Sequence, residues 1–286
     1  MSEWPYRWDH LLRYRYIEII SLWEGRLTTG HLCRCFGIGR QQASKDINHY
    51  LREIAPGNLE YDKYLKGYRP LAGFTPAVTR GTADEYLHLM TRDEQLLGVF
   101  ESLPLTTSNV EQLSPPGRDV SPDVLRPMIQ AARASLRLEV DYVSLSHPDR
   151  EGRIIVPHTL VFTGYRWHVR AWCEKNLDYR DFVLSRFRGE AELLDASENT
   201  EELDTAWNTM VQAVVSPDPR LSDLQRDVIA KDFGMQGGKL RLRTRATLVN
   251  YLLQLLRLDP FNQHSNPLAQ QVVLENLDEL SPWLLR

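Results

Sequence analysis

Cysteine is scarce in this sequence, and long apolar runs are missing from it. The chain contains only Cys33, Cys35 and Cys173, an odd number that is too small for a disulfide framework. No stretch reaches the roughly 18 uncharged apolar residues that a membrane-spanning helix needs. The charged and aromatic segment 1–16 does not resemble a signal peptide. We therefore expect a cytoplasmic protein whose cysteines are small buried side chains.

The common sequence signatures of enzymes are also missing. There is no Walker-type phosphate loop, no G-x-S-x-G or H-E-x-x-H motif and no glycine-rich dinucleotide fingerprint. The pattern His31-x-Cys33-x-Cys35 invites a metal site, but residues two apart on a helix point in different directions and no second ligand pair follows. We expect a protein without catalytic residues, cofactor or metal.

Charge is unevenly distributed along the 286 residues. Segment 1–70 carries 11 Lys and Arg against 8 Asp and Glu, and segment 126–190 has the same balance. Segments 71–125 and 191–286 are acidic, with 3 against 8 and 9 against 14. Two basic segments in a protein of net charge −4 indicate two separate anion-facing surfaces, although a swing of this size also arises by chance.

The first 75 residues follow the order of a winged helix-turn-helix domain. Apolar residues at helical spacing predict a helix that ends at Glu24-Gly25. Thr28 or Thr29 can cap a short second helix, and the turn 37–39 separates it from a longer helix over 40–54. The aromatic segment 58–74, with its Lys-Gly pair, predicts a β-hairpin.

The predicted helix 40–54 has one apolar and one polar side. Ala43, Ile47 and Tyr50 share the apolar side, and the opposite side carries amides and cations that can pair with adenine, guanine or phosphate. An ordinary solvated helix face would look similar, but the position between a glycine-containing turn and a basic hairpin favours DNA recognition. The residues expected to contact DNA are Arg40, Gln41, Gln42, Ser44, Lys45, Asn48 and His49 in the helix and Lys63, Lys66 and Arg69 in the hairpin.

Two further domains are expected after a helical segment and a proline-rich linker at 114–117. The segment 76–121 has helical patterns near 83–90 and 93–102. A helix is predicted over 121–137, with Pro127 marking a kink or a later start, and strands over 138–146, 153–162, 165–173 and 179–187 would form a small antiparallel sheet or barrel. The last part, 205–286, has two predicted strands, 211–218 and 239–248, and two helices, 221–233 and 247–258.

The predicted strand 165–173 alternates between an apolar and a cationic face. Two sets of side chains alternate along it: Trp167, Val169, Ala171 and Cys173 on the core face, and Arg166, His168, Arg170 and Trp172 on the cationic face. If the neighbouring strands add their hydroxyl and guanidinium groups to the cationic face, it suits a nucleotide or single-stranded nucleic acid. A solvated face with ion pairs to Asp141, Asp149 and Asp181 is an equally good interpretation.

Parity along the next strand favours an external anion. Asp181 falls on the side opposite to Arg180 and Arg186, so no carboxylate of this strand is expected to neutralise them. A second cationic stripe comprises Lys239, Arg241, Arg243 and Arg245, and it would either extend the anion site or pair with acidic residues of its own segment.

Three runs of this region resemble a WYL domain. They are Pro157–Val161, Gly164–Cys173 and Tyr179–Arg186. The tripeptide that names the domain appears here as Trp167-His168-Val169, which departs from it at two positions. The sequence Trp-His-Val-Arg-Ala with a preceding Pro-His resembles the BrxR/CapW-type regulators of phage-defence islands.

The resemblance covers nearly the whole chain and implies an α+β fold in three domains. These are a winged helix-turn-helix domain at 1–75, followed by a helical linker at 76–121, a WYL domain with a small Sm-like antiparallel β-barrel at 122–195, and a C-terminal extension domain of the WCX type at 205–286. It implies a homodimeric transcription regulator, usually a repressor, that binds an inverted repeat in double-stranded DNA. The WYL domain would sense an anionic ligand, a nucleotide or a nucleic-acid fragment. Carried over by position, its pocket would comprise Tyr142, Ser144, Ser146, His158, Arg166, Arg170, Arg186 and Arg188.

Two other functions are compatible with the same features. A nucleic-acid-processing enzyme or enzyme accessory could use the arginine cluster as a substrate channel, but it would need a metal or nucleophile constellation that the sequence does not show. A WYL domain that only mediates assembly is the third possibility.

Overall fold

The computed structural model describes residues 7–89, 113, 115–145, 148 and 151–284. The chain divides into two compact units, 1–114 and 115–286, and each is considered by itself. Within the described residues, no helix has the length and apolar character that crossing a membrane requires. The helix predicted near 93–102 lies outside the described part of the chain.

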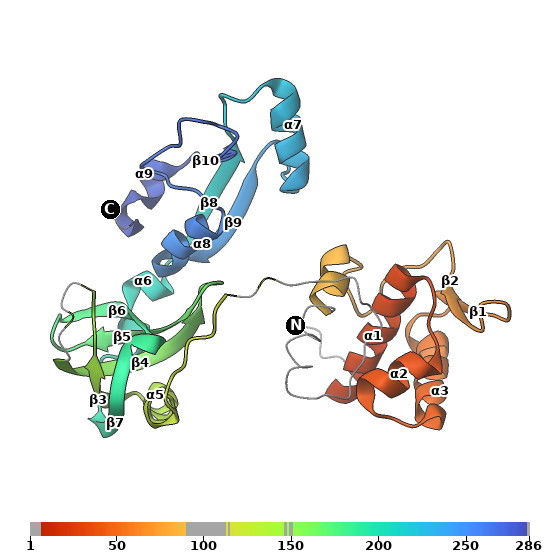
Figure 1. Cartoon of the computed structure of the whole chain (residues 1–286), viewed down its shortest axis with the longest axis horizontal. Coiled ribbons are helices and arrows are strands. Elements are labelled where there is room, and N and C mark those ends of the chain that lie inside the picture. Colours follow the sequence, from red (N-terminus) through yellow and green to blue (C-terminus); the bar gives the residue numbers. More distant parts are fainter. Residues whose placement is uncertain (1–6, 90–112, 114, 146–147, 149–150, 285–286) are drawn as a thin grey trace. The chain divides into compact units, whose positions relative to one another are not determined.

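The first unit has the predicted order of helices and hairpin (Figure 1). Gly25 and Gly37 follow the first two helices with φ angles of 69° and 63°, a region that glycine adopts without steric cost. Thr28 and His31 form a capping box at the start of the second helix. The predicted helix 40–54 ends in a π-helical turn, Tyr50–Ile54. The elements are α1 (Trp8–Glu24), α2 (Thr29–Phe36), α3 (Arg40–His49), β1 (Leu59–Asp62) and β2 (Gly67–Pro70).

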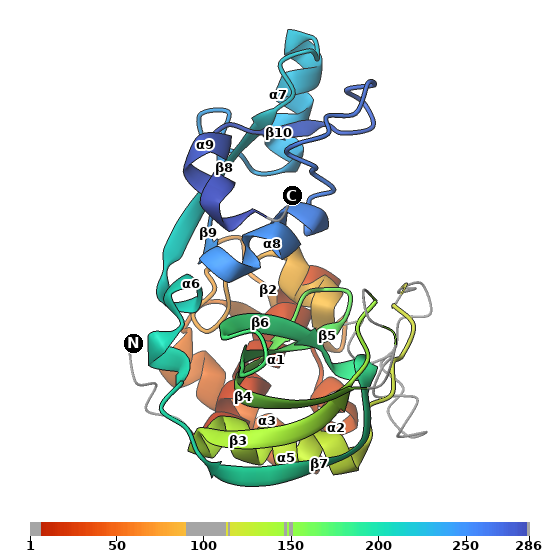
Figure 2. The same cartoon turned by 90° about the vertical axis from the view of Figure 1, so that its left-hand side faces the viewer.

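The second unit begins with helix α5 (Pro122–Ala134) and a five-stranded antiparallel sheet. The Ser121 hydroxyl accepts a hydrogen bond from the Asp123 amide and caps α5, so the helix begins before Pro127 and the later start is wrong. The sheet has the order β6-β5-β4-β3-β7 (Figure 2). Its strands are β3 (Leu136–Tyr142), β4 (Glu151–Phe162), β5 (Trp167–Cys173), β6 (Asp178–Val183) and β7 (Phe187–Ala196).

The sheet differs from the predicted one at its edges. The predicted strand 179–187 is interrupted by a 3₁₀ turn, Leu184–Arg186, and the chain then continues as a fifth strand, β7. Arg186 therefore does not share a strand with Arg180, and parity along 179–187 does not relate the two side chains. Among the described residues β6 and β7 are the two edges and do not pair, so closure into a barrel stays a prediction.

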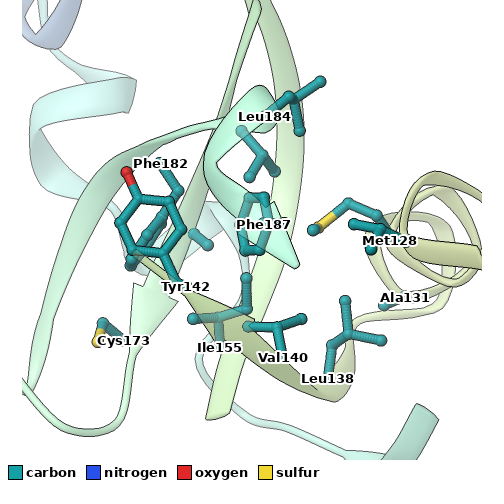
Figure 3. Packing of buried hydrophobic residues seen from close by; sticks show 13 residues of the cluster. Met128, Ala131, Leu138, Val140, Tyr142, Ile155, Cys173, Phe182, Leu184 and Phe187 are labelled. Atoms are coloured by element: carbon teal, nitrogen blue, oxygen red, sulfur yellow. The ribbon is translucent and has the colours of Figure 1, made fainter. Parts of the chain in front are cut away.

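One face of the sheet is packed on α5, as Figure 3 shows. Met128 and Ala131 of α5 join Leu138 and other fully buried strand residues in one hydrophobic cluster. Tyr142 belongs to this cluster, with its ring edge-to-face against Phe182 at a centroid distance of 5.0 Å. This packing leaves the opposite face of the sheet to the segments that follow β7.

The last part of the second unit is a small three-stranded sheet with helices. Its strand order is β10-β8-β9, and β9 is an edge strand. The two predicted strands and the two predicted helices are present. The third strand, β10, was not predicted, because three residues are too few to show an alternating pattern. The elements are α6 (Thr205–Asn208), β8 (Met210–Pro217), α7 (Asp223–Asp232), β9 (Leu240–Arg245), α8 (Val249–Leu255), β10 (Val272–Leu274) and α9 (Leu277–Leu280).

Candidate functional site

Helix α3 presents its predicted polar side to solvent. Ala43 and Ile47 are completely buried against α1 and α2. Gln41, Lys45 and Asn48 are exposed on the other side. Amide and ammonium groups at these positions can reach the edges of bases in a major groove.

Buried polar contacts fix α3 on α1. A carboxylate oxygen of Asp46 lies 2.8 Å from Nε of Arg13, and both side chains are buried. The second oxygen of Asp46 accepts a hydrogen bond of 2.8 Å from Nε2 of Gln42. The ring of His49 stacks on Tyr14 with centroids 5.7 Å apart. Gln42 and His49, both expected to contact DNA, are half-buried and make contacts inside the domain, so their contact with DNA stays a prediction.

The side chains of Arg40 and Ser44 complete the predicted helix contacts. Arg40 is exposed at the first position of α3, and Ser44 is half-buried and accepts a hydrogen bond of 3.5 Å from Nδ2 of Asn48. Both remain on the accessible part of the helix surface.

A buried carboxylate that the sequence analysis missed anchors the segment after the hairpin. Glu18 of α1 is 0% exposed and accepts hydrogen bonds from the Tyr50 hydroxyl at 3.0 Å and from the amides of Ala77 and Thr79 at 2.8 and 3.0 Å. A carboxylate that is buried away from water needs such hydrogen bonds to compensate for its lost hydration. Burial and the charge of Glu18 raise the pKa of Tyr50, which stays a donor. The signal for this role was a single glutamate within the apolar run 17–20.

The basic residues of the hairpin differ in how free they are. Lys63 and Lys66 are exposed, and Lys66 occupies the turn with φ of 49°. Arg69 forms ion pairs with Glu60 and, at 3.6 Å, with Asp62 of the neighbouring strand. Lys63 and Lys66 are therefore the stronger candidates for phosphate contact, since the charge of Arg69 is partly neutralised.

From His168 to Cys173, strand β5 has the two faces that its alternation predicts, and both are covered. Trp167, which was predicted on the core face, is 52% exposed at the start of the strand, so its place in the core is wrong. Val169, Ala171 and Cys173 lie in the core against α5. His168 and Arg170, on the other side, are only 2% and 8% exposed. The cationic face is therefore not an open, solvated surface.

Arg170 is neutralised by two carboxylates of the second unit. Its Nε and Nη2 donate to the two oxygens of Asp204 at 2.7 and 3.1 Å, and Nη1 donates to Asp181 at 3.3 Å. The predicted alternative of an ion pair with Asp181 is thus confirmed for Arg170, and the preference for an external anion is wrong for this residue. Asp181 stands directly opposite Arg170 in the β5–β6 register, a relation that parity along one strand does not reveal.

Asp204 also holds His158 and the start of α6. His158 lies at a register shift of β4, and its Nε2 is 3.3 Å from a carboxylate oxygen of Asp204. The Asp204 carboxylate accepts a further bond of 3.0 Å from the amide of Trp207 and so caps α6. Burial alone would raise the pKa of Asp204, but the hydrogen bonds from His158 and Arg170 hold it well below its usual range. The sequence analysis treated this residue as part of a polar connector.

Tyr251 connects the same group to α8. Its hydroxyl donates to the second oxygen of Asp181 at 3.0 Å, and its ring centroid lies 5.0 Å from that of His168. Figure 2 shows α8 beside β5 and β6. We call the set His158, Arg170, Asp181, Asp204 and Tyr251 the Arg170 network.

The charge of the remaining pocket arginines is not neutralised in this way. Arg166 follows the β4–β5 turn and Arg186 lies in the 3₁₀ turn; both are half-buried, and neither forms an ion pair with a carboxylate of the described residues. Burial and the charges of Arg166 and Arg186 lower the pKa of His168 to about 4. Within the described structure, Nδ1 of His168 is buried without a hydrogen-bond partner.

Three other predicted pocket residues lie apart from this face. Tyr142 is a core residue, because β4 separates β3 from β5 and its ring packs edge-to-face on Phe182 and Phe187. Ser144 follows the end of β3 and is half-buried. Arg188 is exposed and donates to the carbonyls of Ser185 and Phe187 at 2.8 Å. Ser146 lies outside the described residues.

The stripe on β9 divides between internal and free cations. Lys239 lies 2.6 Å from a carboxylate oxygen of Glu275. The guanidinium of Arg245 packs 4.3 Å from the ring of Trp207 and donates to its carbonyl at 2.6 Å. Arg241 and Arg243 are exposed. Of the two predicted alternatives for this stripe, pairing with an acidic residue of the same segment is confirmed for Lys239.

The described residues contain no cluster of three His, Cys, Asp or Glu side chains able to hold a metal ion. In the pattern His31-x-Cys33-x-Cys35, the Nδ1 of His31 accepts a hydrogen bond of 3.2 Å from the amide of Thr28. The imidazole thus has a role in capping α2.

Family models match three separate parts of the chain. The winged helix-turn-helix domain of BrxR transcriptional regulators matches residues 9–92, and the WYL domain matches residues 123–191. The C-terminal dimerization domain of BrxR transcriptional regulators matches residues 210–280.

Similar proteins span most of the sequence. The DNA-binding transcriptional repressor CapW of Escherichia coli (strain KTE188) is 34% identical over 278 residues, which cover 96% of this chain and 91% of CapW. CapW of Pseudomonas aeruginosa gives the same identity and coverage, and CapW of Stenotrophomonas maltophilia is 31% identical over 97% of this chain and 93% of its own. A solved structure, proteasome accessory factor B/C of Arthrobacter aurescens, is 17% identical with a TM-score of 0.26; this chain spans 50% of its length, and the match covers 99% of this chain.

Proposed function

The chain belongs to the BrxR/CapW family of winged-helix, WYL-domain transcriptional regulators, and from that premise we propose that it is a homodimeric repressor that binds an inverted repeat in duplex DNA. The observation that carries the proposal is the polar face of α3, with Gln41, Lys45 and Asn48 exposed above a fully buried apolar face. The genes it represses would belong to a phage-defence locus.

In this proposal α3 reads bases and the hairpin contacts phosphates. Gln41 and Asn48 are suited to adenine, and Lys45 to guanine or phosphate. Lys63 and Lys66 would lie along the DNA backbone and make the binding strongly dependent on salt. Two copies related by a two-fold axis would occupy the two half-sites.

The C-terminal domain supplies a surface for the second copy. Leu224 and Val228, one turn apart on α7, are 82% and 63% exposed, and Leu268 lies beside them along the same apolar groove. Contiguous exposed apolar side chains are typical of protein interfaces. We place the dimer contact at this groove.

The WYL domain would act as a sensor. An anionic ligand there changes repression only if it binds the DNA-bound and DNA-free arrangements with different affinity. Release of the operator on ligand binding is the expected response.

The proposal is tested by operator binding to DNA from directly upstream of the gene. We expect Q41A/K45A to lose specific binding, because each lost base contact costs about 1–3 kcal/mol, while its thermal unfolding stays unchanged. The matched control K175A/Q212A removes the same residue types from exposed positions of the second unit and should bind as the wild type does. Sedimentation of L224E/V228E should show monomers. Wild-type affinity in Q41A/K45A, or a fully dimeric L224E/V228E, would contradict the corresponding assignment.

A further inference from the structure

A buried carboxylate lies where strand β8 leads into helix α7. Asp218 is 0% exposed, and its amide donates to the carbonyl of Gln271 at 2.9 Å, directly before β10. Its carboxylate accepts hydrogen bonds from Nε and Nη2 of Arg220 at 3.0 and 2.6 Å, the paired geometry of a guanidinium with a carboxylate. These hydrogen bonds outweigh the effect of burial and hold the pKa of Asp218 below its usual range, so the group stays charged.

The same carboxylate is bound to the long loop between α8 and β10. Nε2 of Gln263 donates to Oδ2 of Asp218 at 3.2 Å, and Nη1 of Arg220 donates to the carbonyl of Ser265 at 3.4 Å. Asp218 therefore joins the turn before α7 to a loop that lies 45 residues further along the chain. We call Asp218, Arg220 and Gln263 the Asp218 latch.

The loop itself offers little burial to hold it in place. Most of residues 259–269 are exposed. Asp259 accepts hydrogen bonds from the amides of residues 261 and 262, and Oδ1 of Asn266 accepts one from the amide of Leu268 at 2.9 Å. These turns shape the loop locally. Because an exposed loop gains little stability from burial, we expect its position to depend on the latch.

The loop carries one wall of the apolar groove beside α7. Leu268 lines this groove from the loop, and Leu221, Leu224 and Val228 line it from α7 and the turn before it. The hollow has a volume of about 280 Å³. The amide of Leu221 donates to the carbonyl of Asp218 at 3.0 Å, so the latch is connected to both walls. The spacing of the two walls is therefore set by a polar contact that does not line the groove.

We propose that the Asp218 latch positions Leu268 relative to α7 and thereby preforms the groove that receives a second copy of this chain. The proposal rests on the dimer contact placed at this groove under the proposed function. A two-fold interface uses the same patch on both copies, so each latch acts on its own half of the contact. A groove whose walls are fixed before the copies meet loses less conformational freedom on association. Asp218 is thus a positioning residue that acts through Leu268.

The first measurement is the dimer dissociation constant of the full chain, from sedimentation over a dilution series. D218N keeps the size of the side chain but sets an amide nitrogen against a donor of Arg220 or Gln263, so we expect dimerisation to weaken about tenfold. Q263A removes only the bond from the loop and keeps the charged pair, so it tests the latch even if D218N does not fold. It should weaken dimerisation about threefold.

The matched control is D227N. It makes the same exchange at an exposed carboxylate of α7, which pairs with Lys231 one turn away. We expect D227N to dimerise as the wild type does. Wild-type dimerisation in both D218N and Q263A, or an equal loss in D218N and D227N, overturns the proposal.

A double-mutant cycle separates positioning from a general loss of structure. If Asp218 acts through Leu268, truncating Leu268 has little left to remove once the latch is broken. D218N/L268A should then dimerise within about twofold of D218N, although L268A alone weakens the wild type. A general loss of structure makes the two effects multiply, and that result overturns the positioning role.

Cleavage of the loop by chymotrypsin measures its order without help from the second copy. Phe261 is 46% exposed in the loop and is a site for this protease. The rates are compared in L224E/V228E, the variant expected to be monomeric, with and without D218N or Q263A. We expect either latch variant to speed cleavage after Phe261 by about fivefold or more, because opening of a loop governs its cleavage. An unchanged rate overturns the latch.

The two measurements also distinguish failure of the latch from failure of the proposed dimer contact. Wild-type dimers in both L224E/V228E and L268A contradict the groove as the dimer contact and overturn the role of the latch in dimerisation with it. Loss of dimers in L224E/V228E together with wild-type dimers in D218N and Q263A contradicts the latch alone.

Discussion

Both units of the chain bury a carboxylate, but they hold it in opposite ways. Glu18 in the first unit is surrounded by uncharged donors, namely the Tyr50 hydroxyl, the Thr79 hydroxyl and backbone amides of 77–79. Asp204 in the second unit is held by the Arg170 guanidinium and by the His158 imidazole. One site is thus built from the backbone and neutral groups, the other from side chains that carry or can acquire charge.

This difference matches the tasks proposed for the two units. The bonds of Glu18 tie α1 to the segment behind the hairpin, so α3 and the hairpin keep a fixed geometry for reading DNA. The Arg170 network joins three strands of the sheet to α6 and α8, and all its bonds are between side-chain tips except the one from the Trp207 amide to Asp204. Charged tips can exchange partners without unfolding the backbone, and a switch needs two arrangements of similar free energy.

The largest expected effect is a loss of stability of the first unit when its buried carboxylate, Glu18, is removed. Glu18→Ala leaves the Tyr50 hydroxyl and the amides of 77–79 buried without an acceptor, so we expect the first unit to lose on the order of 4 kcal/mol of unfolding free energy. Urea unfolding followed by circular dichroism measures it, and operator binding should be lost as well. Glu24→Ala, at the exposed end of the same helix, is the control and should cost less than about 0.5 kcal/mol. A similar cost for both variants would mean that Glu18 is not an anchor.

The next effect measures coupling within the Arg170 network. A double-mutant cycle of Arg170→Met and Asp204→Asn should give a coupling energy of about 2 kcal/mol, because each single change leaves a buried charge without its main partner. Thermal or urea unfolding of the second unit provides the four values. The exposed pair Arg226 and Asp223 provides a control cycle with an expected coupling below about 0.5 kcal/mol. Equal coupling in the two cycles would remove the distinction between a buried network and a surface pair.

The two sites also differ in how far the sequence predicts them. The exposed polar face of α3 follows from the spacing of Ala43, Ile47 and Tyr50, because the helical period is a local property of the chain. The alternation of β5 likewise predicts that Val169 and Ala171 belong to the core. The order of helices, turn and hairpin is confirmed for the same reason, since caps and glycine turns are local signals.

The Arg170 network depends on relations that no local pattern contains. Asp204 is 34 residues from Arg170 and lies in a connector without periodicity. Asp181 reaches Arg170 through strand pairing, and the strand order places Tyr142 in the core instead of the pocket. Alternation relates side chains only within one strand. The 3₁₀ turn at Leu184–Arg186 ends β6, so alternation along the sequence does not relate Arg186 to Arg180.

The smallest expected effect is a pH dependence of the unfolding free energy of the second unit. It sharpens the comparison because it arises from a buried histidine whose charged form the folded state disfavours. His168 is buried near Arg166 and Arg186, and its pKa is lowered to about 4 from an ordinary value of 6.5. Between these values the unfolded chain binds the proton and the folded chain does not, so stability falls as the pH drops below about 6.5 and the loss is complete below about 4. Lowering the pH from 7.0 to 5.5 should cost about 1 kcal/mol of unfolding free energy, and His168→Phe should remove most of that dependence. Urea unfolding of wild type and variant at the two pH values measures the effect; identical pH dependence in the variant would assign the titration to another group.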